Sequence, residues 1–171
     1  DQLPRGDTHL IANPVFRHKE ITELANQIMP LLIKGHRPRD VLDEGTLYVA
    51  RFAEDGSGQW LALRHGENGL TPASGFADQA DILVRTRQAA DFVKATPMDR
   101  PEWIAVHPES GEVYCSLTNN SQRGTDGKPG IDAVNRRAKN RHGQIVRWRE
   151  AEQDAAASRF TWDVFVECGD P

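Results

Sequence analysis

The sequence predicts a mainly β protein with two helices, and three observations support this fold class. Short runs rich in β-branched and aromatic residues alternate with turn signals, so that they group as β-hairpins. Two stretches of the chain show the helical spacing of apolar side chains. Long polar segments separate the hairpins. Hairpins divided by loops are typical both of propeller blades and of an α+β domain, and both architectures stay open.

The first helix is predicted over residues 21–34. Ile21, Leu24 and Ile28 fall on one stripe of this segment. Pro30 should kink or end the helix, because its ring removes a backbone donor and clashes with the preceding turn.

The first hairpin follows the helix. Residues 46–52 alternate in the manner of a strand, residues 54–58 are a dense turn signal, and residues 60–63 form the returning strand. Residues 69–76 are loop-like, since they contain two glycines and a proline.

The second helix is predicted from Asp78 to about Lys94. Asp78 is a suitable N-cap, and Asp81 in the first turn interacts favourably with the helix dipole. The pair Thr96 and Pro97 ends the segment.

Two further strand pairs complete the prediction. Residues 103–107 and 112–117 flank a short turn and form the second hairpin. Residues 144–149 and 160–166 form the last pair. Between them, residues 119–140 are polar and form a long loop, and loops of that length are usually functional or mobile.

The charge and the hydrophobicity of the chain argue against a nucleic-acid-binding protein and against a membrane-spanning protein. The net charge of −4 gives no basic field for nucleic acid, so no nucleic-acid partner is expected. No run approaches the roughly 18 apolar residues of a membrane span. No signal peptide is visible. Cys115 and Cys168 lack a CxxC partner, so we expect free thiols rather than a zinc site.

The densest group of chemically useful residues is the run from Asp99 to Glu102. Pro101 should push Arg100 into an extended conformation, which would place Arg100 and Glu102 on the same side. A guanidinium grips phosphate oxygens in pairs, and a carboxylate holds a hard cation. The alternative is a surface ion pair at the entrance to a strand.

Other polar residues have two interpretations each. Asn119 and Asn120 follow a strand, where their side-chain carbonyls suit either calcium or a turn. His107 is expected to have a structural role at a strand end.

No GxSxG, HExxH, Walker A or GxGxxG pattern occurs. A basic run forms either an anion-binding surface or a solvated face, and it comprises Arg136, Arg137, Lys139, Arg141, Arg147 and Arg149.

Five blocks of the sequence, in order, resemble the PhoX family of large secreted phosphatases. The most specific block is the run from Met98 to Asn120. The others are Asp43–Phe52, Gly75–Ala80, Asn135–Trp148 and Phe160–Phe165. Several ordered blocks are much harder to obtain by chance than a single motif.

The resemblance implies a β-propeller enzyme that removes phosphate from monoesters with a cluster of calcium and iron ions. It implies that Arg100 and Glu102 are catalytic, with Arg100 binding the phosphate and Glu102 ligating metal. Asn119 and Asn120 lie in the same family block and are further candidates for metal ligands. The resemblance also implies a periplasmic or secreted protein.

The departures from the family pattern limit the expected function. Two family segments that supply a cysteine and glutamates to the metals are absent. Residues 1–38 resemble no family block, and residues 39–171 would supply about two propeller blades. We therefore expect a fragment or truncated homologue that is inactive alone. The alternative is a non-enzymatic β-rich module that binds a partner or self-associates through open sheet edges.

Overall fold

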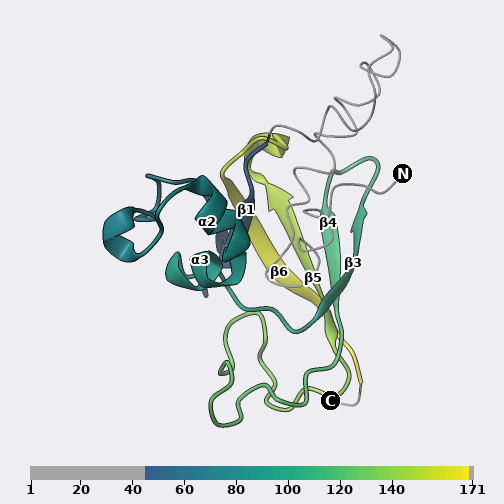
Figure 1. Ribbon diagram of the computed structural model, residues 1–171. Helices are drawn as coiled ribbons and strands as arrows, with labels where there is room; N and C mark the ends of the chain where they lie inside the picture. The colour runs from purple at the N-terminus through teal and green to yellow at the C-terminus, as the bar shows by residue number, and fades with distance from the viewer. Residues whose placement is uncertain (1–44, 170–171) are drawn as a thin grey trace, which may run out of the picture.

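The computed structural model describes residues 45–169, and its main element is one six-stranded sheet (Figure 1). The sheet order is β1-β2-β6-β5-β4-β3, and every neighbouring pair is antiparallel. The strands are β1 (Tyr48–Phe52), β2 (Ser57–Ala62), β3 (Pro101–Val106), β4 (Val113–Leu117), β5 (Gln144–Glu150) and β6 (Arg159–Glu167). The mainly β fold class is confirmed, and such a sheet is consistent with part of a β-propeller. The helix predicted over residues 21–34 lies outside the described residues.

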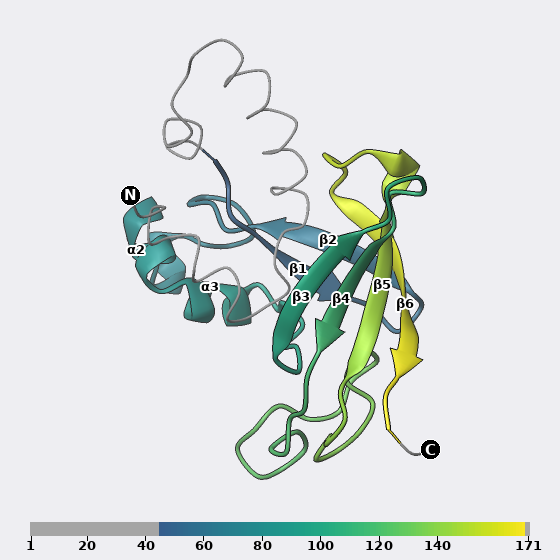
Figure 2. The same cartoon turned by 90° about the vertical axis from the view of Figure 1, so that its right-hand side faces the viewer.

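The three hairpins of the sequence are all present, and two further pairings join them into one sheet. β4 pairs with β5, and a short stretch of β2 pairs with β6 through the register Gly58↔Phe160. The sheet twists strongly, so that β1 and β2 run across the direction of β3, β4 and β5 (Figure 2). The seam between β2 and β6 therefore helps to set the orientation of the first hairpin relative to the rest of the sheet.

The helix predicted from Asp78 to Lys94 is wrong in one respect, because it is two helices. α2 (Gln79–Val84) and α3 (Thr86–Phe92) are separated by Arg85, whose φ of −103° and ψ of 37° are not helical. The N-cap prediction is confirmed, since the Asp78 side chain accepts a hydrogen bond from the Asp81 amide at 2.8 Å. Single 3-10 turns lie at Pro72–Ser74 and Ala151–Gln153.

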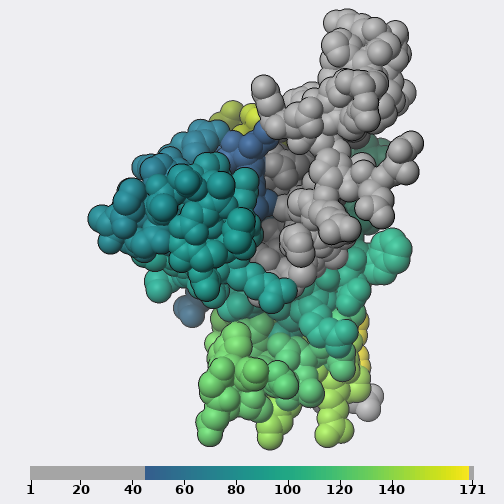
Figure 3. Space-filling model, viewed as in Figure 1, coloured from purple at the N-terminus to yellow at the C-terminus, as the bar shows by residue number. Residues whose placement is uncertain are grey.

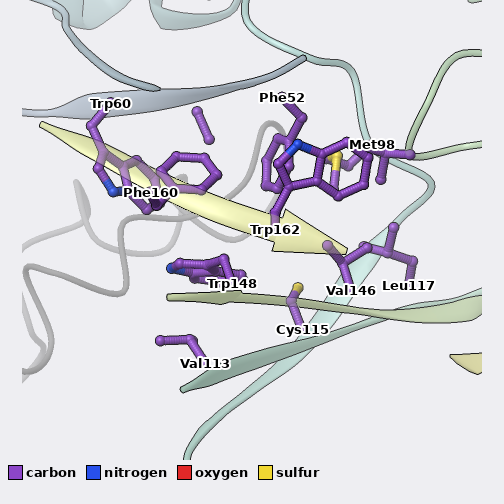
Figure 4. Packing of buried hydrophobic residues seen from close by; sticks show 12 residues of the cluster. Phe52, Trp60, Met98, Val113, Cys115, Leu117, Val146, Trp148, Phe160 and Trp162 are labelled. Atoms are coloured by element: carbon purple, nitrogen blue, oxygen red, sulfur yellow. The ribbon is translucent and has the colours of Figure 1, made fainter. Parts of the chain in front are cut away.

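Buried side chains form two clusters on opposite faces of the first hairpin. The larger cluster fills the inner face of the curved sheet and is rich in aromatic rings, with Trp60, Trp148 and Phe160 in mutual contact (Figure 4). The smaller cluster joins β1 to the helices through contacts that include Val49 and Ile82. Burial on both faces explains why β1 and β2 are apolar at successive positions.

The loop of residues 119–140 is held by polar contacts within the loop and with the segment before β3. An isolated bridge pairs Asn120 with Asn140 at its base. In the space-filling view the loop forms the green lobe at the lower end of the molecule (Figure 3). This lobe folds back toward the segment that leads into β3, which is where the candidate site lies.

Candidate functional site

Arg100 lies just before β3 in an unusual backbone conformation. Its φ is +44°, in the left-handed region that non-glycine residues rarely occupy. The extended conformation expected from Pro101 is therefore wrong. The Arg100 amide donates to the Met98 carbonyl at 3.0 Å, and the Arg100 carbonyl accepts from the Thr118 amide at 3.1 Å. These backbone bonds outweigh the local preference of a residue that precedes proline.

A β-bulge brings Glu102 to the same surface as Arg100. Pro101 pairs with Leu117 and Trp103 with Ser116, so Glu102 is the extra residue of the bulge. The Glu102 carboxylate lies 4.0 Å from an Arg100 guanidinium nitrogen, and their side chains are 45% and 61% exposed. The two groups therefore lie close together at an accessible surface, where an ion pair of this length contributes little stability.

Asn119 joins this surface from the end of β4. Its side-chain Oδ1 accepts a hydrogen bond from Arg100 Nη1 at 3.0 Å. The structure thus brings together three of the four predicted site residues, Arg100, Glu102 and Asn119. We call this exposed group the Arg100 surface.

Asn120 does not join the Arg100 surface. Its side-chain Nδ2 donates to Asp99 Oδ1 at 2.7 Å, and its Oδ1 accepts from the Gln122 amide at 3.0 Å. Asn120 therefore combines a turn-forming role with a contact to a buried carboxylate. Its predicted role as a metal ligand stays a prediction.

Below the Arg100 surface lies a buried ion pair that the sequence analysis missed. The side chains of Asp99 and Arg123 are 0% and 1% exposed, and Arg123 Nε donates to Asp99 Oδ1 at 2.7 Å. Asn135, also buried, accepts from the Asp99 amide through its Oδ1 at 2.9 Å. No local pattern marks Arg123 or Asn135, because they come from a polar loop in which exposed arginine and asparagine are the normal expectation.

The described residues do not by themselves fit a metal cluster. Within residues 45–169, no three His, Cys, Asp or Glu side chains gather in a way that would hold an ion. Glu102 is the single carboxylate of the Arg100 surface, and the Asn119 oxygen already accepts a hydrogen bond from Arg100. Calcium generally needs six or more oxygen ligands. The ligand roles predicted for Glu102 and Asn119 stay predictions.

The cysteines and His107 have structural environments. Cys115 and Cys168 are both free thiols, as expected. Burial raises the pKa of the Cys115 thiol to about 12, so it is an unreactive core residue. His107 Nδ1 accepts hydrogen bonds from the amides of Glu109 and Ser110 and so orders the turn after β3.

The basic run is divided among different parts of the structure. Arg137 donates inward to the carbonyls of Cys168 and Gly143. Arg147 and Arg149 both contact the carboxylate of Glu112 on the sheet. These three cations therefore do not gather into one anion-binding surface. As for membranes, none of the helices between residues 45 and 169 is long and apolar enough to span a bilayer.

Comparisons with known proteins place this geometry in context. The model of the family described as alkaline phosphatase PhoX matches residues 27–171. The chain is similar to a solved structure of Pseudomonas fluorescens PhoX in complex with vanadate, a transition state analogue, with 55% identity and a TM-score of 0.69. The similarity covers 75% of this chain and 23% of that one, so the chain spans about a quarter of the length of its solved relative. No curated protein matches the chain.

Proposed function

Because this chain belongs to the PhoX family of alkaline phosphatases, we propose that it forms part of a phosphatase that hydrolyses phosphate monoesters. The observation that carries the proposal is the Arg100 surface, where an exposed guanidinium is fixed beside a carboxylate. The same geometry would suit a surface ion pair alone, and the family membership favours the functional interpretation.

Arg100 is proposed to bind the phosphate. A guanidinium presents its N–H groups as a planar fork that matches two oxygens of a phosphoryl group. Arg100 Nη1 donates a hydrogen bond to Asn119 at 3.0 Å, and this bond restrains the guanidinium. The other N–H groups of Arg100 stay at an exposed surface. A cation fixed in advance stabilises developing negative charge without reorganisation.

Glu102 is proposed to contribute one carboxylate to bound calcium and iron, with Asn119 and Asn120 as further candidates. The remaining ligands would come from parts of the family that lie outside the 23% of the solved relative covered by this chain. We therefore propose that the chain alone has no turnover. We also propose a periplasmic or secreted location for the enzyme, as the family resemblance implies.

Calorimetric titration with inorganic phosphate and with vanadate tests the role of Arg100. The unaltered chain should bind both oxyanions, and Arg100→Lys should weaken binding by about tenfold, because lysine loses the planar fork. Arg51→Lys is the matched control: Arg51 is an exposed arginine on β1 whose guanidinium bonds to Gln59. Unchanged affinity in both variants would show that only general positive charge matters, and equal losses in both would show that binding is not specific to Arg100.

An assay at alkaline pH with calcium and iron tests the proposed lack of turnover. The expected rate of phosphate monoester hydrolysis is that of the buffer. Turnover that Glu102→Gln abolishes would contradict the proposal, because it would mean that this chain carries a complete site. The Glu102→Gln variant keeps the size of the side chain and removes the charge that a cation needs.

A second candidate function is assembly through the sheet edge. β3 is an edge strand among the described strands, and its Trp103 is 79% exposed. An exposed edge with a large aromatic residue favours association. Sedimentation velocity should show a concentration-dependent oligomer that Trp103→Ser dissociates. A monomer at every concentration would remove this candidate.

A further inference from the structure

The residues around Arg100 form two layers, one exposed and one buried. In the exposed layer Arg100 Nη1 donates to Asn119 Oδ1 at 3.0 Å. In the buried layer the half-buried Asn120 donates from Nδ2 to Oδ1 of the fully buried Asp99 at 2.7 Å. Arg100 directly follows Asp99 in the chain, and Asn119 directly precedes Asn120. We therefore expect a displacement of Asp99 and Asn120 to affect the neighbouring Arg100 and Asn119 as well.

Arg123 fixes the buried layer from the long loop. Its Nε donates to Asp99 Oδ1 at 2.7 Å, and its other nitrogens donate to the carbonyls of Gly130 at 2.9 Å and Pro97 at 2.8 Å. A second carboxylate, that of Asp132, lies 3.5 Å from Nη1. The three nitrogens of the Arg123 guanidinium thus all take part in contacts that hold the segment before Arg100 against the loop.

The backbone on both sides of Arg100 is tied to the same arrangement. The Asp99 amide donates to Asn135 Oδ1 at 2.9 Å, which fixes the residue before Arg100. The Arg100 carbonyl accepts from the Thr118 amide at 3.1 Å, which fixes the residue itself. A left-handed arginine costs free energy, and it persists only when its surroundings over-determine it.

A purely stabilising role does not account well for the buried Asp99–Arg123 ion pair. Two charges taken out of water gain little over well-packed apolar side chains of similar volume. In addition, no donor among residues 45–169 reaches Asp99 Oδ2, although that atom is buried. Such a costly arrangement is expected where a fixed geometry matters more than stability.

We propose that the Asp99–Arg123 pair positions Arg100. The pair holds the Arg100 backbone in its left-handed conformation and so fixes the direction in which the guanidinium projects at the Arg100 surface. The pair acts through Asn120, Asn135 and the backbone, and it does not touch the ligand. Its value to phosphate binding rests on the proposed function of Arg100, whereas the conformational part stands on the contacts alone.

Amide hydrogen exchange tests the conformational part directly. The Thr118 amide reports on the Arg100 carbonyl, and the Trp162 amide, bonded to Gly56 at 2.8 Å, reports on the distant β2–β6 end of the sheet. Arg123→Lys keeps the charge and removes the fork. It should speed Thr118 exchange about tenfold, the loss expected for a charged hydrogen bond, with Trp162 unchanged.

Val49→Ala is the matched control, because it removes buried methyl groups from the smaller cluster and lowers overall stability. It should affect the two amides alike. If Arg123→Lys does not fold, Asn120→Ala replaces it, with metals removed by chelation so that any ligand role of Asn120 is silent. The inference is overturned if Thr118 and Trp162 accelerate equally in the variant that folds.

Calorimetry with inorganic phosphate then connects this positioning to binding. Arg123→Lys should weaken phosphate binding about tenfold when Arg100 is present and have a clearly smaller effect in an Arg100→Lys background, which still binds phosphate but has already lost the planar fork. The same loss in both backgrounds overturns positioning through Arg100. A chain that binds no phosphate, yet shows selective Thr118 exchange, removes the proposed function and supports the positioning of Arg100 by the ion pair.

Discussion

At the scale of single residues, Arg100 combines a strained backbone with a side chain that the proposed function needs. Left-handed conformations of non-glycine residues cost of order 1 kcal/mol and gather at functional sites. The φ of +44° is an observed outlier, and the buried Asp99 beside it explains how it persists. Stability and binding should therefore respond in opposite directions when Arg100 is changed.

Replacement of Arg100 by glycine separates these two effects. Arg100→Gly relieves the backbone strain, and we expect the free energy of unfolding to stay the same or rise by up to about 1 kcal/mol. The same variant should lose binding of phosphate and vanadate, because the guanidinium is gone. Urea unfolding measures the first quantity and calorimetric titration the second.

Lys94→Gly provides the matched control for that prediction. Lys94 is exposed after α3 and has a φ of +61°, so glycine relieves a similar strain there. It should stabilise the chain without changing oxyanion binding. A large loss of stability in Arg100→Gly alone would mean that the side chain supports the fold, which would argue against a binding role.

The sequence correctly predicted that Arg100 and Glu102 lie together on one side, but it predicted the wrong reason for their proximity. Alternation along a strand was the expected cause, whereas a left-handed residue and a bulge bring the side chains together. Both features depend on hydrogen bonds to Thr118 and on the register with β4. Such contacts join residues nearly twenty positions apart, and local propensity does not contain them.

At the scale of elements, the break between α2 and α3 depends on an interaction around Asp81. Its carboxylate accepts from Arg85 Nε at 2.6 Å and from the Ala77 amide at 3.0 Å. The hydrogen bond from Arg85 is the main cause that lowers the pKa of Asp81 to about 2. The residue that interrupts the helix is thus tied back to the first turn.

The lowered pKa gives stability a specific pH dependence. Asp81 is charged in the folded chain down to about pH 2, whereas in the unfolded chain its ordinary pKa is 3.8. Its contribution should be complete above pH 4 and fade as pH falls through about 2. Asp81→Asn should therefore unfold at lower urea concentration than the unaltered chain at pH 7, and the two should converge near pH 2.

Asp91→Asn is the control for this helix pair, because Asp91 is exposed on α3. It should show a smaller difference at pH 7 than Asp81→Asn. A difference for Asp81→Asn that persists unchanged to pH 2 would mean that the side chain's shape, and not its charge, supports the break.

The elements themselves were largely predictable, and their interruptions were not. Turn residues and alternation predicted the existence of all six strands, and Asp78 correctly marked the helix start. The start of β2 was wrong, because Ser57 and Gly58 were assigned to the turn and belong to the strand. The interruption at Arg85 has no proline or glycine to announce it. Instead the Arg85 guanidinium bonds to the Asp81 carboxylate and to the Gly75 carbonyl, and the contact with Gly75 depends on how the preceding loop folds.

At the scale of the whole molecule, the β2–β6 seam supplies the strand pairing that joins the first hairpin to the rest of the sheet. This seam is short, yet it joins the first hairpin and both helices to the remaining four strands. The Trp162 indole strengthens it by donating to the carbonyls of Ala53 and Ser57 at 3.0 and 2.9 Å. Sequence patterns predict hairpins well but say little about which hairpins pair, because such contacts are far apart in the chain.

Gly58 is the position where this seam is most sensitive. It pairs with Phe160, and a methyl group added at Gly58 would overlap the Phe160 ring. That ring is 2% exposed and packs against Phe52 and Trp60 at centroid distances of 5.0 and 5.1 Å, so it has no room to move. Gly58→Ala should therefore lower the free energy of unfolding by about 1–3 kcal/mol, the usual cost of overpacking.

Two further variants show whether the seam is the cause. Gly130→Ala adds the same methyl group where no atom lies within 4 Å, and it should leave the urea midpoint nearly unchanged. Phe160→Leu on its own should destabilise the chain, but in the Gly58→Ala background it should cost less, because the smaller side chain makes room for the new methyl group. Strictly additive losses in the double variant would contradict the proposed clash. A non-additive recovery would show that the two hairpins can share one sheet because the backbone at Gly58 approaches the Phe160 ring closely. The larger core cluster, to which Phe160 belongs, depends on the same close approach.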